Sequence, residues 1–184
     1  LKLKGLKDKA LDKELKPVRD FAKKLLGRLV FLHFLQKKGW LGCPEKGKDW
    51  TGGDPQFLKN LYAAAQDKDR FHSRSLVPLF FDTLNNPNRP GDVFKLPDGD
   101  STLPPCRIPY LNGGLFERDF DAVDKIDFPA ALFDALLEFF GQYNFTIDEN
   151  DPDDHEIGID PEMLGHSFEN LLEDNKDKGA YYTP

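Results

Sequence analysis

The chain has 184 residues, of which 39% are hydrophobic, and its formal net charge is −7 at pH 7. This length suits one domain, or one and a half, and allows a sizeable hydrophobic core. No apolar run approaches the roughly 18 residues needed to cross a bilayer. The two cysteines, Cys43 and Cys106, have neither metal-ligand spacing nor a disulfide pattern. Composition therefore argues against membrane-spanning and disulfide-stabilised classes and favours a soluble, cytoplasmic protein.

The charge is distributed unevenly along the chain. Residues 1–50 contain 14 Lys and Arg against 6 Asp and Glu, whereas residues 51–184 contain 11 against 26, so the two parts carry +8 and −15. DNA phosphates attract a positive surface, which only the first part could offer. The candidate DNA-binding residues are Lys23, Lys24, Arg28, Lys37 and Lys38. A lysine-rich solvated face packed against acidic neighbours is the interpretation that we favour over a DNA contact.

The N-terminal part predicts a central helix. Residues 1–16 show a narrow helical stripe, which predicts the tail of an upstream helix or a linker. A strong helix is then expected from Pro17 to about Lys38, ended by Gly39. Its apolar face is expected to contain Val18, Phe21, Leu25, Leu29, Leu32 and Leu35. His33 lies among these apolar residues without a second ligand nearby, which favours a core histidine over a metal site.

Two further helices and a long loop are predicted next. A helix opens at Asp54 and Pro55 and runs to about Gln66, and another covers roughly Leu76 to Leu84. Residues 85–109 form a proline-rich irregular passage, in which Val93 to Leu96 is a short strand candidate. The run Asn112-Gly113-Gly114 predicts a tight turn.

The remaining residues complete a mainly α fold. Asp127 is expected to cap a largely buried helix that extends to about Tyr143. Short strands at 145–147 and 156–159 predict an antiparallel hairpin, and residues 160–173 predict a last amphipathic helix. The apolar side of that helix contains Met163 or Leu164, Phe168, Leu171 and Leu172. The expected architecture is an irregular bundle of about five helices with a hairpin near 145–159 and a long loop at 85–109.

Three motifs carry a resemblance to a known family. They are the run from Ile159 to Glu173 followed by Gly179-Ala-Tyr-Tyr-Thr-Pro184, the segment from Phe31 to Gly42, and the run from Pro109 to Phe116. Together they resemble the helical region that precedes the catalytic domain of adenine-N6 DNA methyltransferases, above all in large single-chain, type IIG-like restriction-modification enzymes. The resemblance implies S-adenosylmethionine as methyl donor and an adenine in DNA as acceptor. It also implies that Tyr181, Tyr182, Thr183 and Pro184 lie beside the cofactor.

The catalytic motifs of that family are missing from this chain. Neither its glycine-rich cofactor loop nor its Asn-Pro-Pro-aromatic tetrapeptide occurs, because Asn86-Pro87-Asn88 lacks the second proline and the aromatic residue. The only nuclease-like triplet, Glu14-Leu15-Lys16, lies in a lysine-rich helical stretch, and no metal site is expected. The resemblance therefore implies an upstream segment at 1–16, a helical linker domain at 17–174, and the start of a methyltransferase domain at 175–184.

The function implied by this resemblance is that of a non-catalytic scaffold. The chain would bind its own methyltransferase domain in cis and meet DNA through the parent enzyme, which could also have restriction endonuclease activity. No cofactor is expected to bind this segment by itself. Two alternatives remain open. A DNA-binding module would gather its five basic residues on one exposed face and lose affinity with added salt. A protein-interaction module would expose an apolar patch.

Overall fold

The computed structural model describes residues 2–111 and 114–143. These residues form a mainly helical fold with one small antiparallel sheet of two strands, which confirms the predicted fold class. The predicted hairpin near 145–159 and the predicted helix at 160–173 lie outside the described residues, as does most of the Asn112-Gly113-Gly114 turn.

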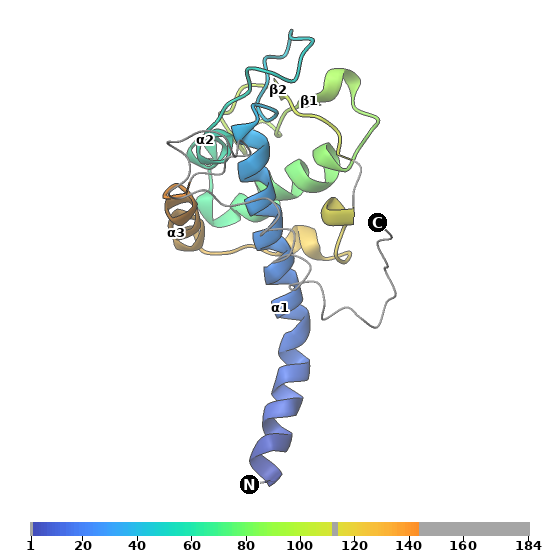
Figure 1. Ribbon diagram of the computed structural model, residues 1–184, viewed down its shortest axis with the longest axis vertical. Helices are drawn as coiled ribbons and strands as arrows, with labels where there is room; N and C mark the ends of the chain where they lie inside the picture. The colour runs from blue at the N-terminus through green and yellow to red at the C-terminus, as the bar shows by residue number, and fades with distance from the viewer. Residues whose placement is uncertain (1, 112–113, 144–184) are drawn as a thin grey trace, which may run out of the picture.

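Helix α1 (Lys2–Lys37) is the axis of the structure. Its C-terminal half is surrounded by the other elements, whereas its N-terminal half extends beyond them (Figure 1). The predicted start at Pro17 was wrong, because the helix continues through this proline. Pro17 is exposed, so water can reach the carbonyl that the missing N–H leaves behind. Although α1 is long, no helix within the described ranges is apolar enough to cross a membrane.

The core forms around one face of α1. Phe21, Leu25, Leu29, Leu32 and Leu35 are buried there, as their spacing predicted. Residues of α2, η2, η3, η5, η6 and α3 also belong to the core, together with Phe71 between η1 and η2; among them are Phe57, Leu61, Leu76, Leu79, Phe80, Phe116, Val123 and Phe133. Val18 was expected on the same face but is 64% exposed. The buried part of α1 therefore begins at about Phe21, one turn after Val18.

Helical segments between α1 and the sheet supply most of the opposing core. They are α2 (Phe57–Ala64), η1 (Lys68–Arg70), η2 (His72–Leu76) and η3 (Pro78–Leu84). Helix α2 is shorter than the predicted span from Asp54 to about Gln66, and its Phe57, Leu58, Leu61 and Tyr62 are buried. The helix predicted at 76–84 is present as η3, but helical turns already begin at η1, and those of η2 and η3 are of the wide π type. Pro78 removes one donor from a regular α-helical ladder at this point.

The small sheet lies inside the passage predicted to be irregular. Strand β1 (Val93–Phe94), which follows η4 (Pro90–Asp92), pairs antiparallel with β2 (Cys106–Arg107). Val93 lies opposite Arg107, and Cys43 forms a further antiparallel bridge to the same arginine. The strand candidate at 93–96 is thus confirmed for its first two residues. Its partner was missed because β2 directly follows Pro104 and Pro105, which are unfavourable in strands.

The last described helix, α3 (Ala130–Phe140), follows η5 (Gly114–Phe116) and η6 (Val123–Lys125). The expected cap at Asp127 was wrong. The Ala130 amide instead donates to the carboxylate of Asp69 (2.7 Å), and Asp127 accepts from the amide and hydroxyl of Ser73. The expected burial of α3 was also wrong, because only Phe133 and Phe140 are buried and Phe139 is 51% exposed. Asp69 of η1 thus binds the backbone at the start of α3, and Asp127, just before α3, binds the backbone of η2.

The backbone contacts of the loop after α1 indicate that a side chain at Gly53 would destabilise the fold. The Gly53 amide donates to the carbonyl of Gly39 (3.0 Å), and the Asp54 amide donates to that of Leu41 (2.8 Å). A Cβ atom at Gly53 would collide with both carbonyl oxygens, which are rigid backbone. We expect Gly53→Ala to lower the free energy of unfolding by about 3 kcal/mol or more, because both neighbours are backbone atoms that cannot move aside. Urea unfolding would measure the change.

Gly52→Ala is the matched control. Gly52 has open space around it, and its positive φ of 81° carries only the ordinary cost of placing alanine in this region, about 1 kcal/mol. Equal losses in the two variants would contradict the steric explanation.

Candidate functional site

The described part of the chain has one fully buried arginine, and it organises the most polar region of the interior. Arg28 of α1 has no exposed surface. Its Nε donates to the carbonyl of Leu115, and its two terminal nitrogens donate to the carbonyl of Glu117 and to Oδ2 of Asp119. Each of the three hydrogen bonds is 2.7 Å long. These partners lie 87 to 91 residues away in sequence. One side chain therefore fixes the segment after η5 against α1.

A buried charge is tolerated only when it is neutralised and hydrogen-bonded. Asp119 supplies the opposite charge and also pairs with Lys24 (2.8 Å). The Arg28 guanidinium carbon lies 5.4 Å and 5.1 Å from the ring centroids of Phe80 and Phe81. Burial lowers the pKa of Arg28, whereas the hydrogen bond and charge of Asp119 raise it. We call Arg28, Asp119, Lys24 and their carbonyl partners the Arg28 junction.

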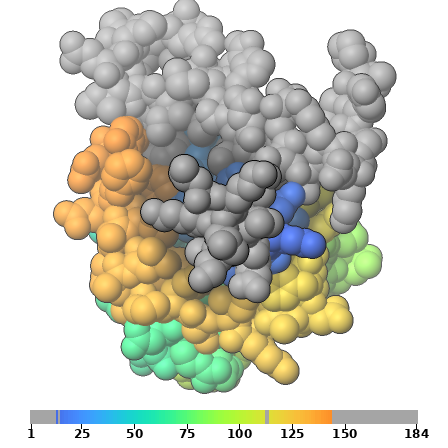
Figure 2. Space-filling view, turned by 90° about the horizontal axis from the view of Figure 1, so that it is seen from below, coloured from blue at the N-terminus to red at the C-terminus, as the bar shows by residue number. Residues whose placement is uncertain are grey.

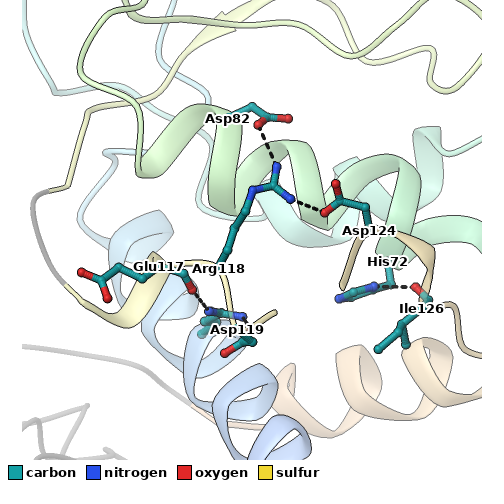
Figure 3. Close-up of polar contacts among 8 residues, drawn as sticks. His72, Asp82, Glu117, Arg118, Asp119, Asp124 and Ile126 are labelled. Atoms are coloured by element: carbon teal, nitrogen blue, oxygen red, sulfur yellow. Dashed lines mark hydrogen bonds and ion pairs between the residues drawn. The ribbon is translucent and has the colours of Figure 1, made fainter. Parts of the chain in front are cut away.

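Arg118 ties the same segment to two more elements. Its side chain extends between Asp82 of η3 and Asp124 of η6, and it forms an ion pair with each (Figure 3). Its guanidinium carbon lies 4.9 Å from the centroid of Phe81, the ring that Arg28 also approaches. Arg118 is half-exposed, in contrast to Arg28. The loop between η5 and η6 is therefore held by one buried and one solvated arginine.

The five predicted DNA-binding residues do not share one exposed face. Arg28 is buried, and Lys24 is half-buried in its ion pair with Asp119. Lys23 is half-buried, and only Lys37 and Lys38, at the C-terminal end of α1, are exposed. The Lys38 ammonium lies 5.4 Å from the ring centroid of Trp40. A DNA contact by the lysines remains a prediction, whereas Arg28 has its donors directed at internal acceptors.

Two other arginines hold irregular segments in the same manner. Arg89 donates to the carbonyls of Asn86, Val93 and Ile108, the last at 2.6 Å. Arg107 donates to the carbonyl of Gly47, and its guanidinium carbon lies 4.4 Å from the ring centroid of Trp50. Because loops leave backbone carbonyls outside helices and strands, multi-donor arginines can satisfy several at once. These residues therefore have structural roles that their charge alone would not indicate.

A buried amide and imidazole link α1 to α2. Gln36 donates through Nε2 to Nδ1 of His33 (3.0 Å) and accepts through Oε1 from the Leu58 amide (3.0 Å). Since Nδ1 accepts, the His33 ring is neutral with its proton on Nε2. Burial, helped by the charge of Lys37, lowers the pKa of His33 to about 4. His33 also packs against the ring of Phe140 in α3, so it is the core histidine that the sequence favoured.

His72 of η2 is a second buried histidine. Its Nδ1 donates to the carbonyl of Ile126 (2.7 Å; Figure 3), and its ring packs edge-on against Phe21 and Phe128. Its Nε2 is buried without a hydrogen-bond partner among the described residues. Burial lowers the pKa of His72, although the Ile126 carbonyl acts in the opposite direction. The contacts are those of a neutral histidine that joins η2 to the segment before α3.

The predicted cofactor neighbours Tyr181, Tyr182, Thr183 and Pro184 lie outside the described residues. Within residues 2–111 and 114–143, no group of three or more His, Cys, Asp and Glu side chains is placed to bind a metal ion. Both thiols in the described ranges, Cys43 and Cys106, are buried and free, and burial raises the pKa of Cys106 to about 12.

Sequence reasoning missed the partners of Arg28 and also missed the role of Gln36. A signal was present, because Arg28 follows Leu25 by three residues and precedes Leu32 by four. It therefore lies on the apolar face of the predicted helix and not with the exposed lysines. Gln36 follows Leu32 by four residues in the same way. The identity of their partners could not be read from this pattern, because Leu115, Glu117 and Asp119 are distant in sequence.

The free energy of unfolding should respond very differently to substitution of Arg28, which binds the loop between η5 and η6 from α1, and of Arg118, which belongs to that loop. Arg28→Leu leaves two carbonyls without their donor and a nearly buried Asp119 paired only with Lys24, so we expect a loss of about 3–5 kcal/mol in the free energy of unfolding. Arg118→Leu removes half-exposed ion pairs and should cost less than about 1 kcal/mol. Chemical denaturation of both variants would measure this difference. Similar losses would show that burial does not govern the strength of these contacts.

His33 predicts a loss of stability in acid. Its folded pKa of about 4 lies below the ordinary 6.5, so the unfolded chain takes up a proton first as the pH falls. The contribution is fully present above about pH 6.5 and falls by about 1.4 kcal/mol per pH unit down to about pH 4. Denaturation curves at pH 7 and pH 5 should therefore differ less for His33→Gln than for the unchanged protein. If the loss of stability between pH 7 and pH 5 were the same in both proteins, His33 would not be its source.

Comparison with known proteins gives one informative similarity. No family model and no solved structure matches the chain. The chain is 29% identical over 178 residues, 90% of its length, to a protein of Methanocaldococcus jannaschii named as a candidate type II restriction enzyme and methyltransferase. It spans only 14% of that protein. This similarity extends over nearly the whole chain and confirms the resemblance to restriction-modification enzymes that the three motifs indicated.

Proposed function

We propose that this chain is a non-catalytic helical scaffold of a bifunctional restriction-modification enzyme. In this proposal it positions an S-adenosylmethionine-dependent adenine-N6 DNA methyltransferase domain that follows it. The observation that carries the proposal is the similarity over 90% of the chain to a small part of a much longer restriction enzyme and methyltransferase. A segment of this size, matched almost end to end, fits a connecting module of such an enzyme.

The internal contacts support a scaffolding role. Arg28, Arg89 and Arg107 direct their donors at backbone carbonyls or at a neighbouring carboxylate. His33 and His72 are buried, and neutral imidazoles packed against aromatic rings suit a core. These contacts hold long irregular segments in place, which is what a rigid support for another domain requires.

The proposed junction with the methyltransferase domain lies at the end of the chain. Tyr181, Tyr182, Thr183 and Pro184 would line one side of the S-adenosylmethionine pocket, and the rest of that pocket would come from residues after Pro184. The methyl group would pass to an adenine amino group in DNA, on a base turned out of the helix. Lys37 and Lys38, which are exposed, could contact the phosphates of that DNA.

The full-length protein tests this proposal. Incubated with DNA and S-adenosylmethionine, it should form N6-methyladenine, which mass spectrometry of the digested DNA would detect. Thr183→Ala should raise the KM for S-adenosylmethionine at least tenfold, because the residue would lie beside the cofactor, while the KM for DNA should change little. Lys176→Ala, in the charged spacer, is the matched control. Absence of N6-methyladenine, or an unchanged KM in Thr183→Ala, would refute the corresponding part of the proposal.

A further inference from the structure

An apolar stripe runs along one side of α1, from its projecting N-terminal half into its packed C-terminal half. Leu15, Val18 and Leu26 are 45%, 64% and 40% exposed, and Ala22 between them is also exposed. Their spacing of three and four residues places them on one side of the helix. In Figure 1 the N-terminal half of α1 extends away from the packed elements, whereas Ala22 and Leu26 belong to the half that those elements surround. A helix face of this kind is normally covered by another apolar surface.

The stripe adjoins the point where the described chain ends. His33 follows Leu26 by seven residues, so it lies on the same side of α1, two turns farther along. Phe140, the last residue of α3, covers His33 with a ring distance of 5.0 Å. Seen along α1 from its N-terminal end, the helix (blue) lies between α3 (orange) and the segment after η5 (yellow) (Figure 2). The chain after Tyr143 therefore starts close to the upper end of the stripe.

We propose that residues 160–173 dock on this stripe as an amphipathic helix. Their apolar positions Leu164, Phe168, Leu171 and Leu172 form a matching face in the sequence. A helix of this length measures about 21 Å, and the stripe from Leu15 to Leu26 measures about 17 Å. The connecting residues 144–159 can extend to roughly 50 Å, so they reach either end of the stripe. Docking would continue the packing that α3 begins on His33.

The net charges favour residues 160–173 over a second copy of the chain as the occupant of the stripe. Residues 2–26 contain nine Lys and Arg against four Asp and Glu, a net charge of +5. Residues 144–184 contain two Lys against twelve Asp and Glu, a net charge of −10. Two copies of α1 would bring like charges together, whereas the acidic segment is attracted to the basic helix. The stripe is apolar, so DNA would leave its leucines and valine uncovered.

Hydrogen exchange of the whole chain, followed by mass spectrometry, tests the docking without the methyltransferase assay. Amides of residues 164–173 should be protected in the unchanged protein. Val18→Glu places a charge in the middle of the stripe at the most exposed of its apolar positions, so the core should stay folded. We expect this variant to accelerate exchange in residues 164–173 at least tenfold and to leave α2 and α3 unchanged. Phe168→Glu should have the same effect on that segment.

Leu132→Glu is the matched control, since Leu132 of α3 is 38% exposed, close to the 40% of Leu26, but lies off the stripe. It should leave exchange in residues 164–173 unchanged. The inference would be overturned by fast exchange of this segment in the unchanged protein, or by unchanged protection in Val18→Glu. It would also be overturned if light scattering showed a dimer that Val18→Glu converts to a monomer, because a second copy would then cover the stripe. Loss of methyl transfer bears on the proposed function and not on this docking.

Discussion

The buried charge of Arg28 is the constraint on which the described fold depends. A guanidinium without access to water must find acceptors inside the protein, and three of them come from residues 115–119. These acceptors hold the loop against α1, and through Arg118 and the shared ring of Phe81 the same loop also contacts η3 and η6. An apolar side chain at position 28 could fill the space, but it could not specify which segment lies there. The charge of Arg28 therefore specifies that residues 115–119 pack against this part of α1.

Polar contacts between distant segments recur throughout the structure. Gln36 of α1 binds the first turn of α2, Asp69 of η1 accepts from the first amide of α3, and Asp127, before α3, accepts from the Ser73 amide of η2. Arg89 and Arg107 bind the carbonyls of loops around the small sheet. A fold with short helices and a sheet of two short strands has few regular ladders to satisfy its backbone. Buried side chains with several donors or acceptors replace those ladders and hold the irregular segments in place.

The same central helix lies within the basic part of the chain, residues 1–50, and the acidic part follows it. Its C-terminal half belongs to the core, its N-terminal half carries lysines, and an exposed apolar stripe runs from one half into the other. Such a helix can join a packed body to segments that come from elsewhere in the protein. The chain as a whole, with this helix at its start, matches a short portion of a protein named as a candidate type II restriction enzyme and methyltransferase.

The sequence by itself determined the features that depend on local spacing and on single residues. Apolar steps of three and four residues predicted the buried face of α1 from Phe21 to Leu35, and Gly39 predicted its end. The local rules failed at Pro17, at Asp127 and at Arg28, because an exposed helix tolerates a proline and because an aspartate or arginine binds whichever backbone group lies nearest in space. The helical spacing already places Arg28 on the apolar face of α1, but only the tertiary structure decided which acceptors it binds, since they lie about ninety residues away and no local pattern encodes that distance.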